Sequence, residues 1–263
     1  MPGLDRLAAQ RQQDTEVAAR MDAAYEAADR QDYATALAIW GPLAHAGVAR
    51  AQNNIGACFA EGLAVDRDPA LAQRWLTLAA EAGDPVGQRN LAALYFRGEG
   101  IEQDYARAAE LYRAAAEQGD GPAQDMLSWM QLEGECIPRD IAQAQRWARA
   151  AADQGIAPAM TRLGMLYHNA LGVDRDPAEA ARWWRRGGER GDADGQAMLG
   201  AALALGSGVA REPVAALAWL LRAQAGGSAL AAPFLPAARA ALDAEGLAEA
   251  QRRAVLPLPE PSS

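Results

Sequence analysis

The chain has 263 residues, a formal net charge of −9 and a hydrophobic content of 51%. All 25 basic residues are arginines, which excludes P-loop lysines and Schiff-base lysines. The excess of carboxylates repels phosphate backbones and anionic lipids, so nucleic acid and membrane surfaces are poor candidate partners. Abundant alanine and glycine, with few β-branched residues, favour short helices broken by turns, and we expect an all-α fold.

Residues 1–50 are predicted to form an N-terminal helix followed by a divergent leading repeat. Ala36 and Gly47 keep the spacing of the repeats that follow, but the turn between the two helices is shorter. The N-terminus has no apolar segment of the signal-peptide type, and no stretch of the chain reaches the ~18 apolar residues of a spanning helix. We therefore expect a cytoplasmic protein with no membrane span.

Residues 51–232 contain five repeats with a period of 36 residues. Each repeat ends in a glycine, which suits a left-handed helix terminus: Gly83, Gly119, Gly155, Gly191 and Gly227. Each also has an acidic residue that can cap its second helix: Asp68, Asp104, Asp140, Asp176 and Glu212. In the second helix an alanine precedes a large side chain by three residues, which allows close packing of helices. Each repeat is therefore predicted to be helix, loop, helix.

The C-terminal part of the chain departs from the repeat. Residues 233–254, with the sequence AARAALDAEGLAEAQRRAV after the prolines, predict one amphipathic helix that covers the last apolar seam. Residues 255–263 are rich in proline and polar residues and are predicted to be a disordered tail.

The pattern A-Q-x-x-L-G-x-x-Y-x-x-G-x-G-V-x-x-D-x-x-x-A-x-x-W-x-x-x-A-A-x-x-G resembles the Sel1-like repeats, which are relatives of tetratricopeptide repeats. The resemblance covers roughly residues 20–230 and implies a right-handed α/α solenoid with a groove lined by first helices. It also implies an adaptor or regulator that binds other proteins, and some bacterial relatives resemble immunity or accessory proteins of toxins. Gly187 and Gly188 depart from the pattern, and we expect each to loosen its helix by about 0.8–1 kcal/mol relative to alanine.

No catalytic residue, metal site or cofactor is predicted. His45 and His168 belong to different repeats, and neither C-x-x-C nor H-E-x-x-H spacing occurs. Cys58 falls at an apolar position and predicts a buried, inert thiol, while its distance in sequence from Cys136 makes a disulfide framework improbable.

The tetratricopeptide phase, carried over to the first helices, predicts a groove for a protein or peptide partner. Its residues include the aromatic and arginine side chains that are typical of binding hot spots: Asn53, Arg89, Phe96, Asp125, Trp129, Leu132, Arg162, Met165 and His168. In the alternative interpretation Trp129 packs sideways to compensate for Gln131.

We expect a non-enzymatic interaction module. An immunity protein that neutralises a toxin and an enzyme of unrecognised type are the two alternatives. The partner and the oligomeric state stay open at this point.

Overall fold

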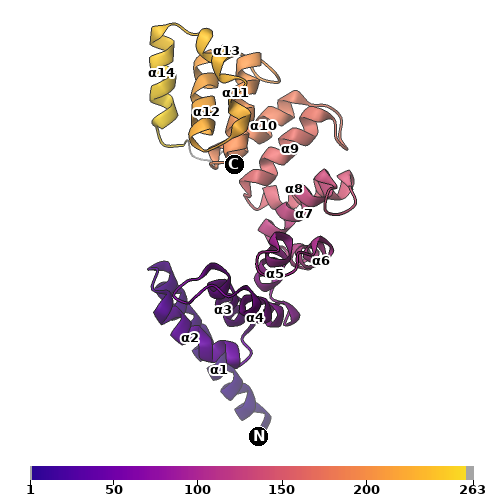
Figure 1. Cartoon of the computed structure of the whole chain (residues 1–263), viewed down its shortest axis with the longest axis vertical. Helices are drawn as coiled ribbons and strands as arrows, with labels where there is room; N and C mark the ends of the chain where they lie inside the picture. Colours follow the sequence, from indigo (N-terminus) through magenta and orange to yellow (C-terminus); the bar gives the residue numbers. More distant parts are fainter. Residues whose placement is uncertain (1, 259–263) are drawn as a thin grey trace. The chain divides into compact units, whose positions relative to one another are not determined.

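The computed structural model describes residues 2–258, with side chains from residue 11 onward. Over this range the chain forms fourteen α-helices and one short 3-10 helix, η1, and no strand (Figure 1). The helices are α1 Pro2–Asp29, α2 Tyr33–His45, α3 Ala49–Glu61, α4 Pro69–Glu81, α5 Pro85–Arg97, α6 Tyr105–Glu117, α7 Gly121–Glu133, α8 Ile141–Asp153, α9 Ala157–Asn169, α10 Pro177–Glu189, α11 Ala193–Leu205, α12 Pro213–Ala225, η1 Ala229–Ala231, α13 Leu235–Ala240 and α14 Ala244–Val255. The all-α prediction is confirmed.

The chain divides into two compact units, which we describe separately. Unit 1 is Met1–Asp120 and contains the pairs α1/α2, α3/α4 and α5/α6. Its leading pair is held by Met21, Ala24 and Ala27 of α1, which pack against Trp40 and Leu43 of α2. Within the next pairs each helix packs on its successor, and α3 also packs on α5.

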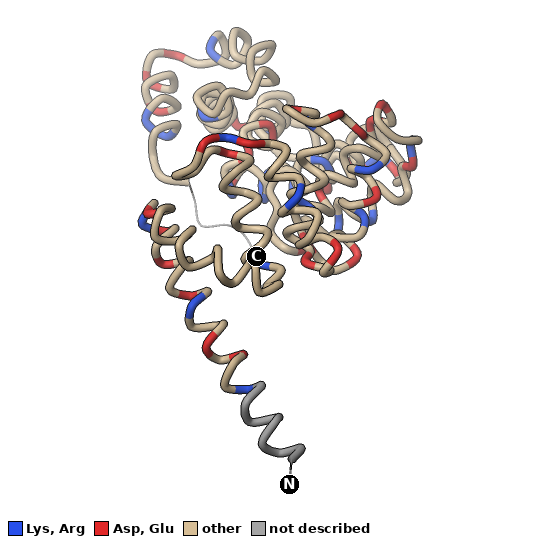
Figure 2. The backbone as a smooth tube through the Cα atoms, turned by 60° about the horizontal axis from the view of Figure 1, so that its bottom comes forward, with Lys and Arg blue, Asp and Glu red and all other residues tan. Residues whose placement is uncertain are grey.

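Unit 2 is Gly121–Ser263 and contains the pairs α7/α8, α9/α10 and α11/α12, followed by η1, α13 and α14. Leu163, Leu166 and Trp183 are buried in the core of its middle pair. Leu217 and Leu220 of α12 are buried against the C-terminal elements. Figure 2 shows acidic and basic residues scattered along the backbone, with neither sign gathered in one stretch.

Helix ends follow the predicted signals with one exception. The five glycines that close the repeats have φ between 83° and 91°, a left-handed conformation that strains other residues. Asp68, Asp104, Asp140 and Asp176 each accept a hydrogen bond from the third backbone N–H of the following helix. Glu212 makes no such bond, so the predicted cap of α12 is wrong. Its side chain is longer by one methylene than that of the aspartates.

A glutamine near the start of the first helix ties that helix to the preceding second helix. The Nε2 of Gln52 donates to the carbonyl of Ala44 at 3.1 Å, and that of Gln196 donates to Gly188 at 3.0 Å. These side chains are buried, and each adds a second hydrogen bond to a carbonyl that already accepts a backbone N–H, from Gly47 and from Gly191 respectively. This explains why glutamine recurs at that phase.

Helix α10 contains the glycine pair expected to loosen it, and the structure gives the pair a packing role. A Cβ atom on Gly187 would lie 2.6 Å from Oγ1 of Thr161 on α9, and one on Gly188 would lie 3.2 Å from Gln196 on α11. The pair therefore allows α9 and α11 to approach α10 more closely than alanine would. An alanine at Gly187 would be strained by this contact, so the lower helix propensity of glycine does not decide its effect.

The C-terminal segment differs from the single helix predicted over 233–254. It forms α13 and α14, separated by Ala241–Asp243, and Asp243 caps α14 by accepting a bond from Gly246 N–H at 2.8 Å. Pro233 precedes α13 and Pro236 lies in its first turn, where the missing N–H costs nothing, and the new cap at Asp243 separates α14 from α13. Of the predicted tail 255–263, residues 259–263 lie outside the described range.

Candidate functional site

The first helices of unit 2 share one face, and this face contains a cavity of about 220 Å³. We call it the first-helix cavity. It is lined by Trp129, Leu132 and Glu133 of α7, Pro158, Thr161, Arg162 and Met165 of α9, Asp192 and Asp194 at the start of α11, and Leu230 of η1.

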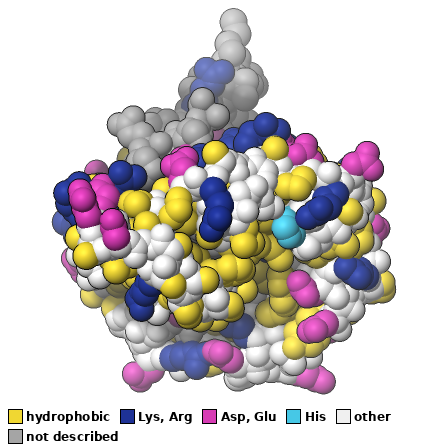
Figure 3. Space-filling view, turned by 90° about the horizontal axis from the view of Figure 1, so that it is seen from above, with side chains coloured by type: hydrophobic (Ala, Val, Ile, Leu, Met, Phe, Trp, Pro, Cys, Tyr) yellow, Lys and Arg dark blue, Asp and Glu magenta, His cyan; other side chains and the backbone are white. Residues whose placement is uncertain are grey.

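The wall of the first-helix cavity is largely apolar. Trp129 and Leu132 lie one turn apart on α7, and Met165 lies on the neighbouring first helix, α9. All three side chains are partly exposed, whereas Leu127 and Leu163 on the opposite sides of these helices are fully buried. The wall thus leaves apolar area in contact with solvent after the core is complete. Figure 3 shows a face on which apolar side chains gather and charged ones surround them.

The polar residues of the cavity are held by specific bonds. Arg162 forms an ion pair with Asp125 of α7, and the two side chains are only 12% and 15% exposed. Oδ2 of Asp192 accepts hydrogen bonds from Thr161 Oγ1 at 2.6 Å and from Gly195 N–H at 2.7 Å. These bonds join α7 to α9 and α9 to α11, so the wall is fixed by contacts between successive repeats.

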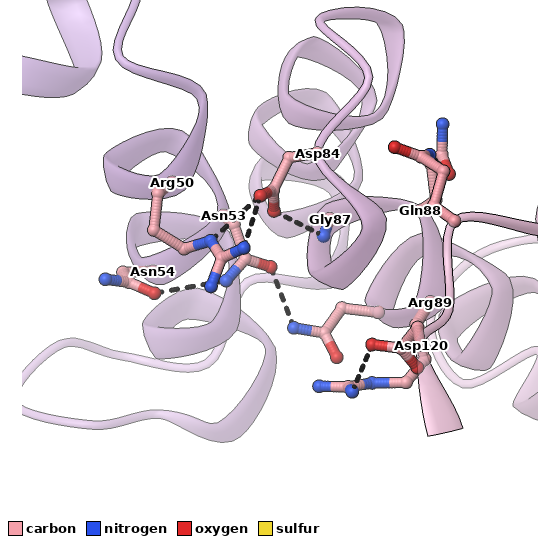
Figure 4. A network of polar contacts seen from close by, with 10 residues as sticks. Arg50, Asn53, Asn54, Asp84, Gly87, Gln88, Arg89 and Asp120 are labelled. Carbon is pink, nitrogen blue, oxygen red and sulfur yellow. Dashed lines mark hydrogen bonds and ion pairs between the residues drawn. The ribbon is translucent and has the colours of Figure 1, made fainter. Parts of the chain in front are cut away.

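The first-helix face of unit 1 is polar instead (Figure 4). Asn90 Nδ2 on α5 donates to Asn53 Oδ1 on α3 at 2.8 Å, and Asn53 Nδ2 donates to Asn54 Oδ1 at 3.1 Å. Asp84 accepts from Gly87 N–H at 2.7 Å and forms an ion pair with Arg50 at 2.7 Å. We call this set the amide ladder. It joins α3 to α5 by side-chain bonds at the phase where unit 2 has the Asp125–Arg162 pair, whereas Ala57 and Ala93 stand at the phase of Trp129 and Met165.

The remaining predicted residues lie apart from the cavity. Asn53 is 3% exposed, which corrects the expectation that it faces a ligand. Arg89 is paired with Asp120 at 2.8 Å. The ring of Phe96 packs edge-on against Tyr105, with ring centroids 5.2 Å apart. The ring of His168 packs against the Trp184 ring at 5.3 Å.

The structure therefore brings four of the nine predicted residues together in the cavity: Trp129, Leu132, Arg162 and Met165. Asp125 supports them through its pair with Arg162. Sequence reasoning missed Glu133, Asp192, Asp194, Pro158 and Leu230. Asp192 shares a 36-residue phase with Asp84, which could have marked both as capping residues at the start of first helices.

The described residues offer little reactive chemistry. They contain no cluster of three or more potential metal ligands. Burial raises the pKa of the Cys58 thiol to about 11, which keeps it in the unreactive neutral form at physiological pH. Burial also raises the pKa of Cys136 above its usual value. No helix in the described part of the chain is both long and apolar enough to cross a bilayer.

Trp183 is a packing residue with cationic neighbours. It is 3% exposed, and the guanidinium groups of Arg149 and Arg186 lie 4.7 and 4.5 Å from the centroid of its ring. The contact with Arg149 joins α8 to α10, whereas Arg186 belongs to α10 itself.

Comparison with known proteins agrees with this architecture. The Sel1 repeat family model matches five segments: 49–84, 85–120, 121–156, 157–192 and 193–228. A protective antigen of uropathogenic Escherichia coli with an SLR fold superposes with a TM-score of 0.84 and 29% identity over 93% of this chain. The present chain spans 54% of that protein's length.

A Sel1 repeat protein from Oxalobacter formigenes has a TM-score of 0.79 and 26% identity, covering 92% of this chain and 99% of its own. The comparison with curated protein sequences found no match. The family model covers more than half of the residues, and the structural neighbours share the repeat architecture. The chain belongs to the Sel1 repeat family of α solenoids, whose members are generally protein-interaction modules.

Proposed function

We propose that this protein is a non-catalytic interaction module that holds a segment of a partner protein in the first-helix cavity. The observation that carries the proposal is the apolar wall of Trp129, Leu132 and Met165, which stays partly exposed on a rigid frame of paired helices. Exposed apolar area of this kind marks interaction sites, and tryptophan is enriched among the residues that dominate binding energy.

Several features support binding rather than catalysis. The Cys58 thiol is buried with a pKa of about 11, and His168 packs against a tryptophan ring outside the cavity. Asp192 accepts hydrogen bonds from Thr161 and Gly195, and Asp194 accepts one from Ser228, so these carboxylates join neighbouring elements. A net charge of −9 also favours a protein partner over a nucleic acid. An adaptor and a toxin-immunity protein would use the same surface, and the identity of the partner separates the two.

The test is affinity capture from the source organism with the tagged chain, followed by titration of the purified captured protein. Trp129→Ala should weaken that titrated complex by at least about 2 kcal/mol, or roughly 30-fold, because it removes the largest apolar contact in the wall. Met165→Asp should have a similar effect, since it places a charge in the same wall.

Val255→Ala is the matched control, because Val255 is an exposed apolar residue of the same unit, 83% accessible on α14. This variant should bind as the wild type does. Circular dichroism should show an unchanged helical signal in all three variants. Equal affinity of the wild type and Trp129→Ala would place the interaction elsewhere and refute the proposal.

A further inference from the structure

The size of the first-helix cavity restricts what can enter it. Its volume of about 220 Å³ is below the ~300–1,000 Å³ that small-molecule and cofactor sites usually have. One large apolar side chain fits such a volume, with the backbone on either side of it outside the mouth. The residues next to this anchor must therefore lie beside the rim of the cavity.

The rim carries negative charge. Glu133 is exposed at the end of α7, and Asp192 and Asp194 stand at the start of α11. The two aspartates accept hydrogen bonds from neutral donors: Asp192 from Thr161 and Gly195, and Asp194 from Ser228 at 2.5 Å. Neutral donors do not cancel the negative charge of a carboxylate.

Among the described residues that line the cavity, the cation is Arg162, and it already forms an ion pair. Arg162 is paired with Asp125, and both side chains are largely buried. The charges of Arg162 and Asp125 cancel, which leaves the three rim carboxylates to set the local field. A cation held beside them is attracted, and a carboxylate held there is repelled.

We propose that the partner segment is cationic, with one large apolar side chain in the first-helix cavity and lysine or arginine immediately next to it. This inference rests on the proposed function, because it specifies the chemistry of the segment that the cavity takes. The apolar anchor supplies the buried contact, and the neighbouring cations supply selectivity and a faster association.

The experiment uses three short peptides with the same central phenylalanine, flanked by lysines, glutamines or glutamates. Fluorescence polarisation measures their affinity for the full chain. We expect the lysine peptide to bind at least about tenfold more tightly than the glutamine peptide at low salt, and the glutamate peptide to bind most weakly. Added salt should reduce these differences.

The rim variant Glu133→Gln/Asp194→Asn should lose most of the preference for the lysine peptide, while its affinity for the glutamine peptide stays unchanged. Its matched control is Glu81→Gln/Glu117→Gln, which changes the net charge equally at exposed positions of unit 1. If the control lowers the preference as much as the rim variant does, the effect belongs to the overall charge and the proposal is wrong.

Two further outcomes separate this inference from the proposed function. If the three peptides bind equally and all lose affinity in Trp129→Ala, the charge preference is refuted and the cavity remains a peptide site. If no peptide responds to Trp129→Ala, the proposed function fails with it. A dimer of the chain alone that dissociates on Trp129→Ala in sedimentation would show that a second copy occupies the cavity instead.

Discussion

The two units use one repeat for different purposes on the face of their first helices. In unit 1 that face carries the amide ladder, and Ala57 and Ala93 stand at the phase of Trp129 and Met165. In unit 2 the Asp125–Arg162 ion pair stands at the phase of Asn53 and Asn90, and Trp129 and Met165 border a cavity. The glycines, alanines and aspartates that build the helical pairs are shared by both units. The repeat therefore fixes the frame and leaves the first-helix face to be specialised.

Ion pairs differ in burial within each unit. In unit 1 the side chains of Arg67 and Glu99 are 50% and 56% exposed, while those of Arg89 and Asp120 are 27% and 6% exposed. In unit 2 the side chains of Arg182 and Glu179 are 67% and 24% exposed, while those of Arg162, which lines the cavity, and Asp125 are 12% and 15% exposed. A buried pair is costly to break because the remaining partner is an unpaired charge, whereas an exposed pair contributes little. Four predictions use this comparison.

The largest effect is expected from breaking the buried pair. Arg162→Met should destabilise unit 2 by about 3 kcal/mol, because Asp125 is then left buried without its partner. Arg67→Met in unit 1 should cost less than about 1 kcal/mol. Hydrogen exchange followed by mass spectrometry resolves the loss of protection in α7 and α9. The double variant Arg162→Met/Asp125→Leu should recover most of the stability, and failure to recover would assign the loss to packing.

A second comparison uses glycines at the same phase of the repeat. A Cβ on Gly164 would lie 2.3 Å from Trp184 Nε1 and 3.0 Å from the carbonyl of Ala180, while one on Gly56 would meet Leu76 Cγ at 2.7 Å. Leucine can change its rotamer, but the tryptophan ring is buried and rigid. Gly164→Ala should therefore cost about 2–3 kcal/mol and Gly56→Ala about 1 kcal/mol in urea denaturation. Equal costs would mean that the α3/α4 and α9/α10 contacts are equally tightly packed.

The amide ladder provides the third prediction. Asn53→Ala should lower the stability of unit 1 by about 1–2 kcal/mol, because it leaves the amide of Asn90 without its acceptor. It should leave the affinity of the lysine-flanked peptide unchanged. A loss of peptide affinity at constant stability would place part of the binding surface in unit 1 and would contradict the division of roles between the units.

The smallest effect is an alkaline sensitivity of unit 1. Burial raises the pKa of Cys58 to about 11 and that of Tyr112 to about 12, from 9.0 and 10.0. Both folded pKa values exceed the unfolded ones, so their stabilising contribution is complete below pH 9 and is lost as the pH rises towards 11–12. Between pH 8 and pH 10 we expect the free energy of unfolding of unit 1 to fall by about 1 kcal/mol.

The control for this effect is the double variant Cys58→Ala/Tyr112→Phe. Its urea midpoint should be lower than that of the wild type at pH 8 and should change less between the two pH values. An identical pH dependence of variant and wild type would show that other groups cause the alkaline loss.

Much of the fold could be predicted because periodicity reports the phase of each residue. Glycine at the end of a repeat and aspartate before a second helix have local causes, and both signals were reliable apart from Glu212. The break between α13 and α14 was missed because Asp243, which caps α14, was read as lying inside one continuous helix.

The candidate site was harder to predict because phase does not reveal the partner of a side chain. Arg162 and Asn53 lie on first helices as expected, yet one is paired with Asp125 and the other is buried under Asn90. Which of these residues touches solvent depends on the neighbouring repeat, 36 or 37 positions away. Leu230 was missed because it lies in η1, where the repeat pattern ends.

The double use of Asp84 and Asp192 has a consequence for moving repeats between proteins. Each aspartate ends one repeat, caps the first helix of the next, and bonds back to the first helix of its own repeat. A graft cut at residue 85 or 193 would leave its own cap behind in the donor, so the splice belongs one residue earlier. Val48 and Ile156 occupy the same position without a side-chain cap. A graft that begins after either of them therefore loses no capping bond when it is cut from the donor.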